Sequence, residues 1–218
     1  MPLDRPGEVR WIEVDPCYVF HVGNAHEDAA GRIHLDVARY TREDIIAIWG
    51  NVGGAPVPAG PGAAAAAAGV ARMYRWTIDP AAGRATGALL DERGAEFPTV
   101  DDSRVGRPSR YLYSVWDFTV GGSDRHSGIL RVDTEQGATA VHDLGPDVVA
   151  GEAVFVPSPD PGRAEDDGWL ISIATKRDGS ASKLLIMDAT DVGGEPVATV
   201  TLPRGVPAGF HGSWVPEA

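Results

Sequence analysis

The sequence predicts an all-β fold, and three of its features point the same way. The chain of 218 residues contains 27 glycines and 17 prolines, spread along its length as expected where turns join short strands. About ten segments between these breaks alternate apolar and polar side chains or form short apolar runs. Convincing helical periodicity is confined to one short segment, REDIIAIWG (42–50). Many short strands at regular spacing indicate a sandwich, a barrel or a propeller.

The clearest strand pattern lies in GRIHLDVARY (31–40). Every second residue from Ile33 to Val37 is apolar and the residues between them are polar, which is the period of a half-buried strand. The stretch VFHVGNA (19–25) is expected to be a buried strand. Further strands are predicted at RMYRWTID (72–79), GALLD (87–91), RYLYSVWDF (110–118), GILRVDT (128–134), TAVHDL (139–144), EAVFVPS (152–158), GWLISIAT (168–175), SKLLIMD (182–188) and VATVTL (197–202).

Turn sequences separate several of these strands. DPAAG (79–83), TEQG (134–137) and the acidic EDDG (165–168) predict hairpins between neighbouring strands. One segment differs from the rest, because NVGGAPVPAGPGAAAAAAGVA (51–71) crowds glycine and proline before an alanine run. It is predicted to be a flexible surface loop that contributes little to function.

Composition excludes several classes of partner. Nineteen basic and thirty-one acidic residues give a net charge of −12, which repels phosphate backbones and anionic lipid, so no nucleic-acid partner is expected. No run of about 18 apolar residues is present, so no integral membrane segment is expected. The single cysteine, Cys17, excludes an intrachain disulfide and suits a reducing compartment. The N-terminal MPLDRPGEVRW lacks a signal-peptide core, and a soluble cytoplasmic protein is expected.

Two histidines occur in similar settings near opposite ends of the chain. His21 in VFHVGNA and His211 in GFHGSW each follow an aromatic residue directly and have a glycine within the next two positions. A lone histidine in an apolar strand is more often a core residue with a satisfied hydrogen bond than a ligand. However, Glu96 and Glu152 each open an apolar stretch, and a buried carboxylate needs a partner. Two histidine–glutamate pairs are the usual means of orienting metal-binding imidazoles.

The other candidate residues carry no assigned chemistry. No zinc, Walker, dinucleotide-binding or nucleophile-elbow motif is present. The aspartates of the EDDG turn lack the spacing of an EF-hand and are expected to be solvated. His34 is also expected to be solvated, and His26 falls on the opposite strand face from His21. The histidines without a predicted role are His26, His34, His126 and His142.

Seven segments, taken together and in order, resemble the carotenoid cleavage oxygenases. That family also holds lignostilbene dioxygenases and the retinoid isomerohydrolase of the pigment epithelium. One such motif alone would be weak, whereas seven in the family's order are highly specific. The segments are CYVFHVGNAHED (17–28), MYRWTIDPAAG (73–83), EFPTVDDSRVGRPSRYLY (96–113), GEAVFVPSP (151–159), EDDGWLISIAT (165–175), KLLIMDA (183–189) and VPAGFHGSW (206–214).

The resemblance implies a fold and a site. Residues 1–218 would form the C-terminal part of a seven-bladed β-propeller, roughly its last three to four blades. Members of the family hold one Fe(II) with four histidines at the propeller axis. His21 and His211 match the third and fourth of these ligands, with Glu96 bracing His21 and Glu152 bracing His211. The flanking Phe20 and Val22 would pack within the blade while His21 points to the axis.

The implied function is a non-haem Fe(II)-dependent dioxygenase. It would use O2 to cleave a C=C bond of an apolar alkene (a carotenoid, an apocarotenoid or a stilbene) into carbonyl products. The family's chain is about twice as long, and its other two iron histidines precede the region that Trp11 begins to match. The alternative is a non-catalytic truncated β fragment, or one half of a split enzyme that needs its N-terminal half or associates with itself.

Overall fold

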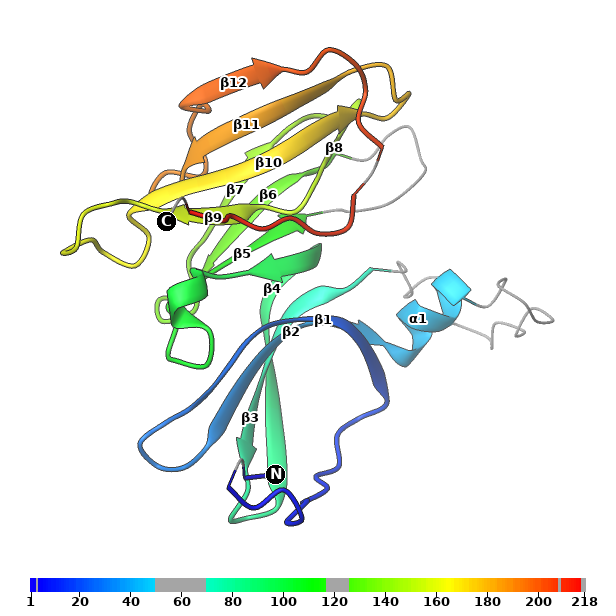
Figure 1. Cartoon of the computed structure of the whole chain (residues 1–218). Coiled ribbons are helices and arrows are strands. Elements are labelled where there is room, and N and C mark those ends of the chain that lie inside the picture. Colours follow the sequence, from blue (N-terminus) through cyan, green and yellow to red (C-terminus); the bar gives the residue numbers. More distant parts are fainter. Residues whose placement is uncertain (3, 50–69, 117–125, 208, 217–218) are drawn as a thin grey trace.

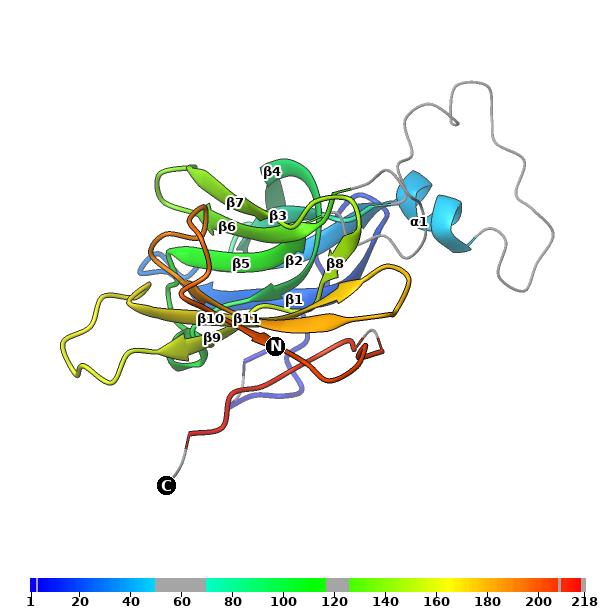
Figure 2. The ribbon, with the colours of Figure 1, turned by 90° about the horizontal axis from the view of Figure 1, so that it is seen from above.

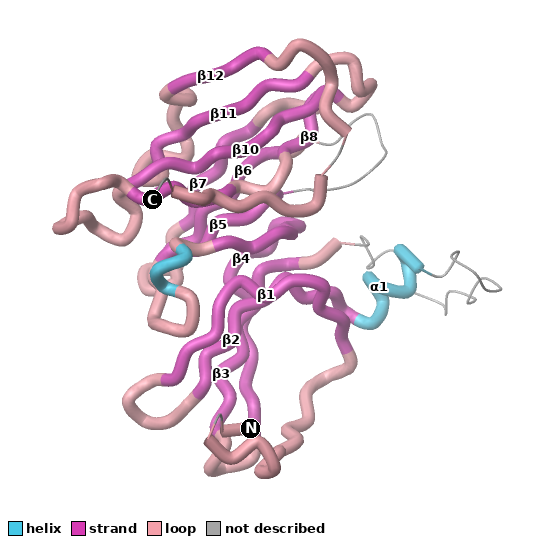
Figure 3. Tube along the Cα trace, viewed as in Figure 1, coloured by secondary structure: helices cyan, strands magenta, loops and turns pink. Residues whose placement is uncertain are grey.

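The computed structural model describes residues 1–2, 4–49, 70–116, 126–207 and 209–216. Among these residues nearly all of the regular secondary structure is antiparallel strand, which confirms the all-β prediction (Figures 1 and 3). The predicted flexible loop at 51–71 falls almost wholly outside the described residues. The strands are β1 (Cys17–Glu27), β2 (Ile33–Thr41), β3 (Arg72–Asp79), β4 (Arg84–Thr99), β5 (Tyr111–Trp116), β6 (Gly128–Asp133), β7 (Thr139–Asp143), β8 (Val148–Ala150), β9 (Val154–Pro157), β10 (Gly168–Lys176), β11 (Ser182–Asp188) and β12 (Ala198–Thr201).

Strands β1 to β7 form one sheet in sequence order, and the long strand β4 divides it into two units. The first part of β4, Arg84–Leu89, pairs with β3, whereas Ala95–Thr99 pairs with β5. Strand β4 is thus the last strand of the unit β1–β4 and the first strand of the unit β4–β7. Each unit is a four-stranded antiparallel meander, which is the architecture of a propeller blade.

The remaining strands form a second sheet in the order β12-β11-β10-β8, with β9 also paired to β10 (Figure 1). Turns close the hairpins at two of the predicted positions, where Gly83 and Gly137 adopt positive φ angles of 64° and 66°. Only glycine takes up this conformation without steric cost, so these residues fix the β3–β4 and β6–β7 connections.

Two apolar cores hold the units together. One joins β2 to β6 and includes Ala38, Met73 and Leu130, all fully buried. The other lies between β4–β6 and the second sheet, where the Tyr113 ring on β5 stacks on Phe155 of β9 at 5.8 Å between centroids. Adjacent units therefore pack face to face, as blades do.

The predicted short helix is present as α1 (Arg42–Trp49), which stands at the side of the first sheet in both ribbon views (Figures 1 and 2). The Thr41 hydroxyl oxygen accepts a hydrogen bond from the Asp44 backbone N–H. The Thr41 hydroxyl in turn donates to the Asp44 carboxylate. This capping arrangement satisfies orphan groups at the helix start. Among the described residues, no helix is long and apolar enough to cross a membrane.

Three expectations about exposure were wrong. Phe20 and Val22 do not pack within the blade, because β1 is an edge strand that leaves them 41% and 54% exposed. His34 is not solvated: its Nε2 lies 3.0 Å from an Asp28 carboxylate oxygen and its ring stacks on that of His26. Asp166 in the EDDG turn accepts a 2.7 Å hydrogen bond from Arg131. Strand alternation fixes the side of a residue but not what covers it.

Candidate metal centre

His21 projects from β1 on the face opposite to that of Phe20 and Val22. Its Nδ1 lies 2.7 Å from Oε2 of Glu96, which stands at the start of the part of β4 that pairs with β5. The His21 side chain is 25% exposed and that of Glu96 only 7%. The pair therefore links the first strands of two adjacent units and is largely shielded from solvent.

A local break in strand pairing fixes the Glu96 carboxylate. Its Oε2 also accepts a 2.8 Å hydrogen bond from the backbone N–H of Phe97. Phe97 has a φ of 53°, and the β4–β5 register shifts between Glu96 and Thr99. A bulky residue in the left-handed region costs of order 1–3 kcal/mol and persists only where surrounding packing enforces it. In this conformation the Phe97 N–H points at the Glu96 carboxylate and orients it.

His211 and Glu152 form a second pair outside regular strands. The His211 Nδ1 lies 3.2 Å from Oε1 of Glu152, and the Gly212 backbone N–H donates to Oε2 at 2.6 Å. The His211 side chain is 55% exposed and that of Glu152 is 11% exposed. This glutamate therefore uses one oxygen for the imidazole and the other for the backbone, and together they hold the C-terminal segment in place.

The two imidazoles lie next to each other although 190 positions separate them in the sequence numbering. Their ring centroids are 4.9 Å apart at an interplanar angle of 69°. The Phe97 ring contacts both, at 4.9 Å from His21 and 5.7 Å from His211. An ionised carboxylate only accepts hydrogen bonds, so a neutral imidazole paired with it carries its proton on Nδ1 and keeps the lone pair on Nε2. In that form the two rings would offer two nitrogen donors at one place.

The donor set is incomplete as a metal site by itself. Within the part of the chain that the structure describes, no group of three or more histidine, cysteine, aspartate or glutamate side chains could hold a metal ion. The glutamates face the Nδ1 atoms and are occupied there. Three of the other histidines have partners elsewhere: His26 stacks on His34, and His126 Nδ1 lies 2.7 Å from an Asp143 carboxylate oxygen.

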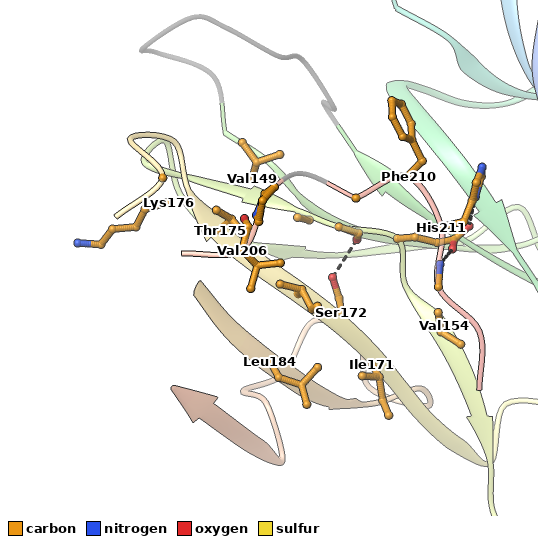
Figure 4. Close-up of a pocket in the computed structure, with 18 of the residues that line it drawn as sticks. Val149, Val154, Ile171, Ser172, Thr175, Lys176, Leu184, Val206, Phe210 and His211 are labelled. Carbon is orange, nitrogen blue, oxygen red and sulfur yellow. Dashed lines mark hydrogen bonds and ion pairs between the residues drawn. The ribbon is translucent and has the colours of Figure 1, made fainter. Parts of the chain in front are cut away.

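An open pocket of about 760 Å³ lies beside His211, between the C-terminal segment and the second sheet (Figure 4). Its walls are mostly apolar, with Val154, Ile171 and Leu184 on the sheet side and Phe210 on the other. Such a lining suits a hydrocarbon better than a polar molecule. Sequence patterning missed this pocket, since strands and a chain end distant in sequence build it together.

Phe97 was also missed as a site residue. The only feature of the sequence that could have indicated a role in the site is its position directly after Glu96 in the motif EFPTVDD. The residue is buried and belongs to the core between the first and second sheets. It therefore connects the packing of the units to the placement of both imidazoles.

Comparisons with known proteins agree with this architecture. Residues 2–216 match the family model of the retinal pigment epithelial membrane protein, RPE65. A carotenoid cleavage oxygenase of Mycobacterium tuberculosis is 38% identical over 99% of this chain and 41% of its own length. The apocarotenoid-15,15'-oxygenase of Synechocystis is 37% identical over 95% of the chain and 40% of its own length. The chain thus spans about 40% of the length of these relatives.

Solved structures extend the similarity to the fold. The cobalt-substituted Synechocystis ACO matches 94% of the chain and 40% of its own length, at a TM-score of 0.74 and 34% identity. A chimera of ACO and RPE65 gives a TM-score of 0.74 at 32% identity, covering 94% of this chain and 40% of its own length. These matches confirm the predicted partial β-propeller. The chain belongs to the RPE65 family, which includes the carotenoid cleavage oxygenases.

Proposed function

We propose that this chain supplies two ligands of a non-haem Fe(II) centre in an oxygenase that cleaves a C=C bond. His21 and His211 would bind iron through Nε2, with Glu96 and Glu152 holding Nδ1 of each ring. The observation that carries the proposal is the contact of the two imidazoles, each with its Nδ1 on a glutamate. Glutamates in this position fix ring orientation and raise ligand basicity.

The donor chemistry fits the metal. Neutral imidazoles suit Fe(II), and a first shell without carboxylate leaves the charge of the ion uncompensated by anions. When bound, the iron would supply activation of O2 next to the double bond of the substrate. The residues of this chain would orient the ligands and exclude water: Phe97 shields one side of both rings.

The substrate class follows from the relatives and the pocket. The relatives carry the names of carotenoid and apocarotenoid oxygenases. The apolar pocket beside His211 would admit an extended hydrocarbon such as a carotenoid, an apocarotenoid or a stilbene. Cleavage with O2 would give two carbonyl products. With one cysteine, Cys17, and no disulfide to form, we expect the protein to act in the cytoplasm.

Metal binding and turnover test the proposal. The chain is titrated anaerobically with Fe(II) or Co(II) while histidine side-chain resonances are followed by NMR. We expect metal-dependent changes at His21 and His211, lost in His21→Ala and His211→Ala. The matched control is His126→Ala, which removes an exposed histidine paired with Asp143 outside the site. Unchanged spectra in the wild type, or equal effects of all three variants, contradict the assignment.

Turnover is measured by aerobic incubation of the Fe(II)-loaded chain with carotenoids, apocarotenals and hydroxystilbenes. A full-length relative serves as positive control, and aldehyde products are detected by chromatography. Aldehyde formation that His211→Ala abolishes supports the oxygenase. Metal binding without any product restricts this chain to holding part of the site.

A second candidate function is that of one half of a split enzyme, or of a non-catalytic fragment. The observation that favours it is a row of exposed apolar side chains along the edge strand β1, namely Tyr18, Phe20 and Val22. Exposed apolar patches mark contact surfaces. Size-exclusion chromatography with light scattering should then show self-association, or a complex with an N-terminal half. A monomer that melts cooperatively well above about 60 °C contradicts this second reading.

A further inference from the structure

The Glu96 carboxylate uses only one of its two oxygens in direct hydrogen bonds. Oε2 accepts from His21 and from the Phe97 backbone. Oε1 is buried and has no hydrogen-bond partner among the described residues. A buried acceptor without a partner destabilises the folded state, and more so when it is charged. A group that orients a ligand through one oxygen and leaves the other unsatisfied calls for a further partner.

A small cavity lies beside this carboxylate. Its volume is about 10 Å³, which is close to the minimum that holds one water molecule. Tyr40 and Glu96 contribute the two polar side chains of the lining. The residues around the cavity are Tyr40, Val70, Ala71, Gly94, Ala95 and Glu96.

Tyr40 is held in place to act as a donor. It pairs with Tyr18 across β1 and β2, and its ring contacts that of Phe20 edge to face at 5.5 Å. Burial, the negative charge of Glu96, a hydrogen bond to Glu96 and the negative charge of Asp44 raise the pKa of the Tyr40 hydroxyl well above its usual range. The hydroxyl therefore keeps its proton and can donate it.

We propose that Tyr40 is a positioning residue for Glu96, acting together with one buried water in this cavity. The Tyr40 hydroxyl donates to the carboxylate, and the water donates one proton to the Tyr40 oxygen and the other to Oε1. Both carboxylate oxygens are then fixed, so the carboxylate cannot rotate about its terminal bond and the His21 ring keeps one orientation. The role of these hydrogen bonds in metal binding rests on the proposed function, but the hydrogen bonds themselves do not depend on it.

The test uses the metal-free chain, so that it stands apart from the iron proposal. The variant Tyr40→Phe removes one hydroxyl and little volume. The matched control is Tyr113→Phe, since the Tyr113 hydroxyl is also buried and has no hydrogen-bond partner among the described residues, but it lies in the core beside Phe155. Glu96→Ala removes the carboxylate altogether and shows how His21 behaves without its hydrogen-bond partner.

NMR measures exchange of the His21 Nδ1 proton with solvent. We expect Tyr40→Phe to speed this exchange several-fold, Glu96→Ala to speed it further, and Tyr113→Phe to leave it unchanged. A crystal structure of the wild type should place one water between Tyr40 and Glu96, absent in Tyr40→Phe. Exchange in Tyr40→Phe equal to wild type, or a cavity without water in the wild type, overturns the proposal.

Co(II) titration of the same proteins separates the two proposals. If the iron site is correct, Tyr40→Phe should weaken binding about threefold to tenfold, less than the 10–100-fold typical of a direct partner of the ligand. Failure of the wild type to bind Co(II) counts against the proposed function and leaves the exchange result to decide on Tyr40. Binding that Glu96→Ala weakens but Tyr40→Phe does not counts against Tyr40 alone.

Discussion

The two histidine–glutamate pairs are alike in chemistry and differ in how the chain holds them. His21 and Glu96 lie on strands of adjacent units, 2.7 Å apart and shielded from solvent. His211 and Glu152 lie in irregular segments, 3.2 Å apart, with the imidazole more than half exposed. In the first pair the sheet enforces the contact, whereas in the second the contact itself holds the segment. The same two residue types therefore contribute differently to stability and to ligand orientation.

The largest expected difference concerns metal affinity after Glu→Gln substitution. Glu152 uses one oxygen for His211 and the other for the Gly212 N–H, so in Glu152→Gln the amide NH2 must face one donor. Glu96 accepts from His21 and from the Phe97 N–H through the same oxygen, Oε2, so the amide oxygen in Glu96→Gln can keep both of these bonds. In a complete site we expect affinity losses toward 100-fold for Glu152→Gln and nearer 10-fold for Glu96→Gln, within the range typical of such partners. Metal titration of the two variants measures these affinities. A larger loss for Glu96→Gln than for Glu152→Gln would contradict the way the carboxylate oxygens are assigned to their donors.

Stability should show the opposite order. Glu96→Ala leaves the buried Phe97 N–H and the His21 ring without an acceptor, which should cost about 2 kcal/mol. Glu152→Ala acts on an exposed histidine and should cost less than about 1 kcal/mol. Calorimetric melting of both variants should therefore give a shift of about 4–8 °C for the first and of less than about 4 °C for the second. Equal shifts would mean that burial does not distinguish the pairs.

Phe97 joins the two pairs, and Phe97→Leu tests that link. Loss of the ring removes its contacts with both imidazoles, while leucine keeps most of the packing, so we expect a cost of about 1 kcal/mol. His211 should become more mobile than His21, because His21 still has the strands beside it. Side-chain NMR relaxation of the two histidines measures this. Equal mobility gains would show that Phe97 supports both rings alike.

A carboxylate held by arginine should give a smaller effect than the loss of Glu96, and it serves as a reference for both pairs. The hydrogen bond from Arg110 lowers the pKa of Asp133 to about 2. Since the folded pKa lies below the unfolded value of about 3.9, this stabilisation is present above about pH 4 and is lost as the pH falls toward 2. Asp133→Asn should therefore melt below the wild type at pH 6, by about 1–3 °C, and the gap should close between pH 4 and 2. A gap independent of pH would assign the effect to the Asp133 turn contacts instead.

The strands were within reach of sequence reasoning because they depend on short-range patterns. Alternation located β2, β3, β10 and β11 nearly to the residue, and glycines with positive φ close two of the predicted turns. The pairing of His21 with Glu96 and of His211 with Glu152 came from resemblance to a family rather than from spacing. The structure brings each pair into contact, while the role of these residues as metal ligands and braces remains a prediction.

The sequence by itself determined where strands and turns occur, and on which face of β1 His21 lies. It could not determine that β1 forms a sheet edge, which leaves Phe20 and Val22 exposed, or that β4 serves two units. It could not place Tyr40 beside Glu96 either. Alternation is a local property of one strand. Exposure, cavities and partners depend on which strands pack on either side, and long-range contacts between units decide that.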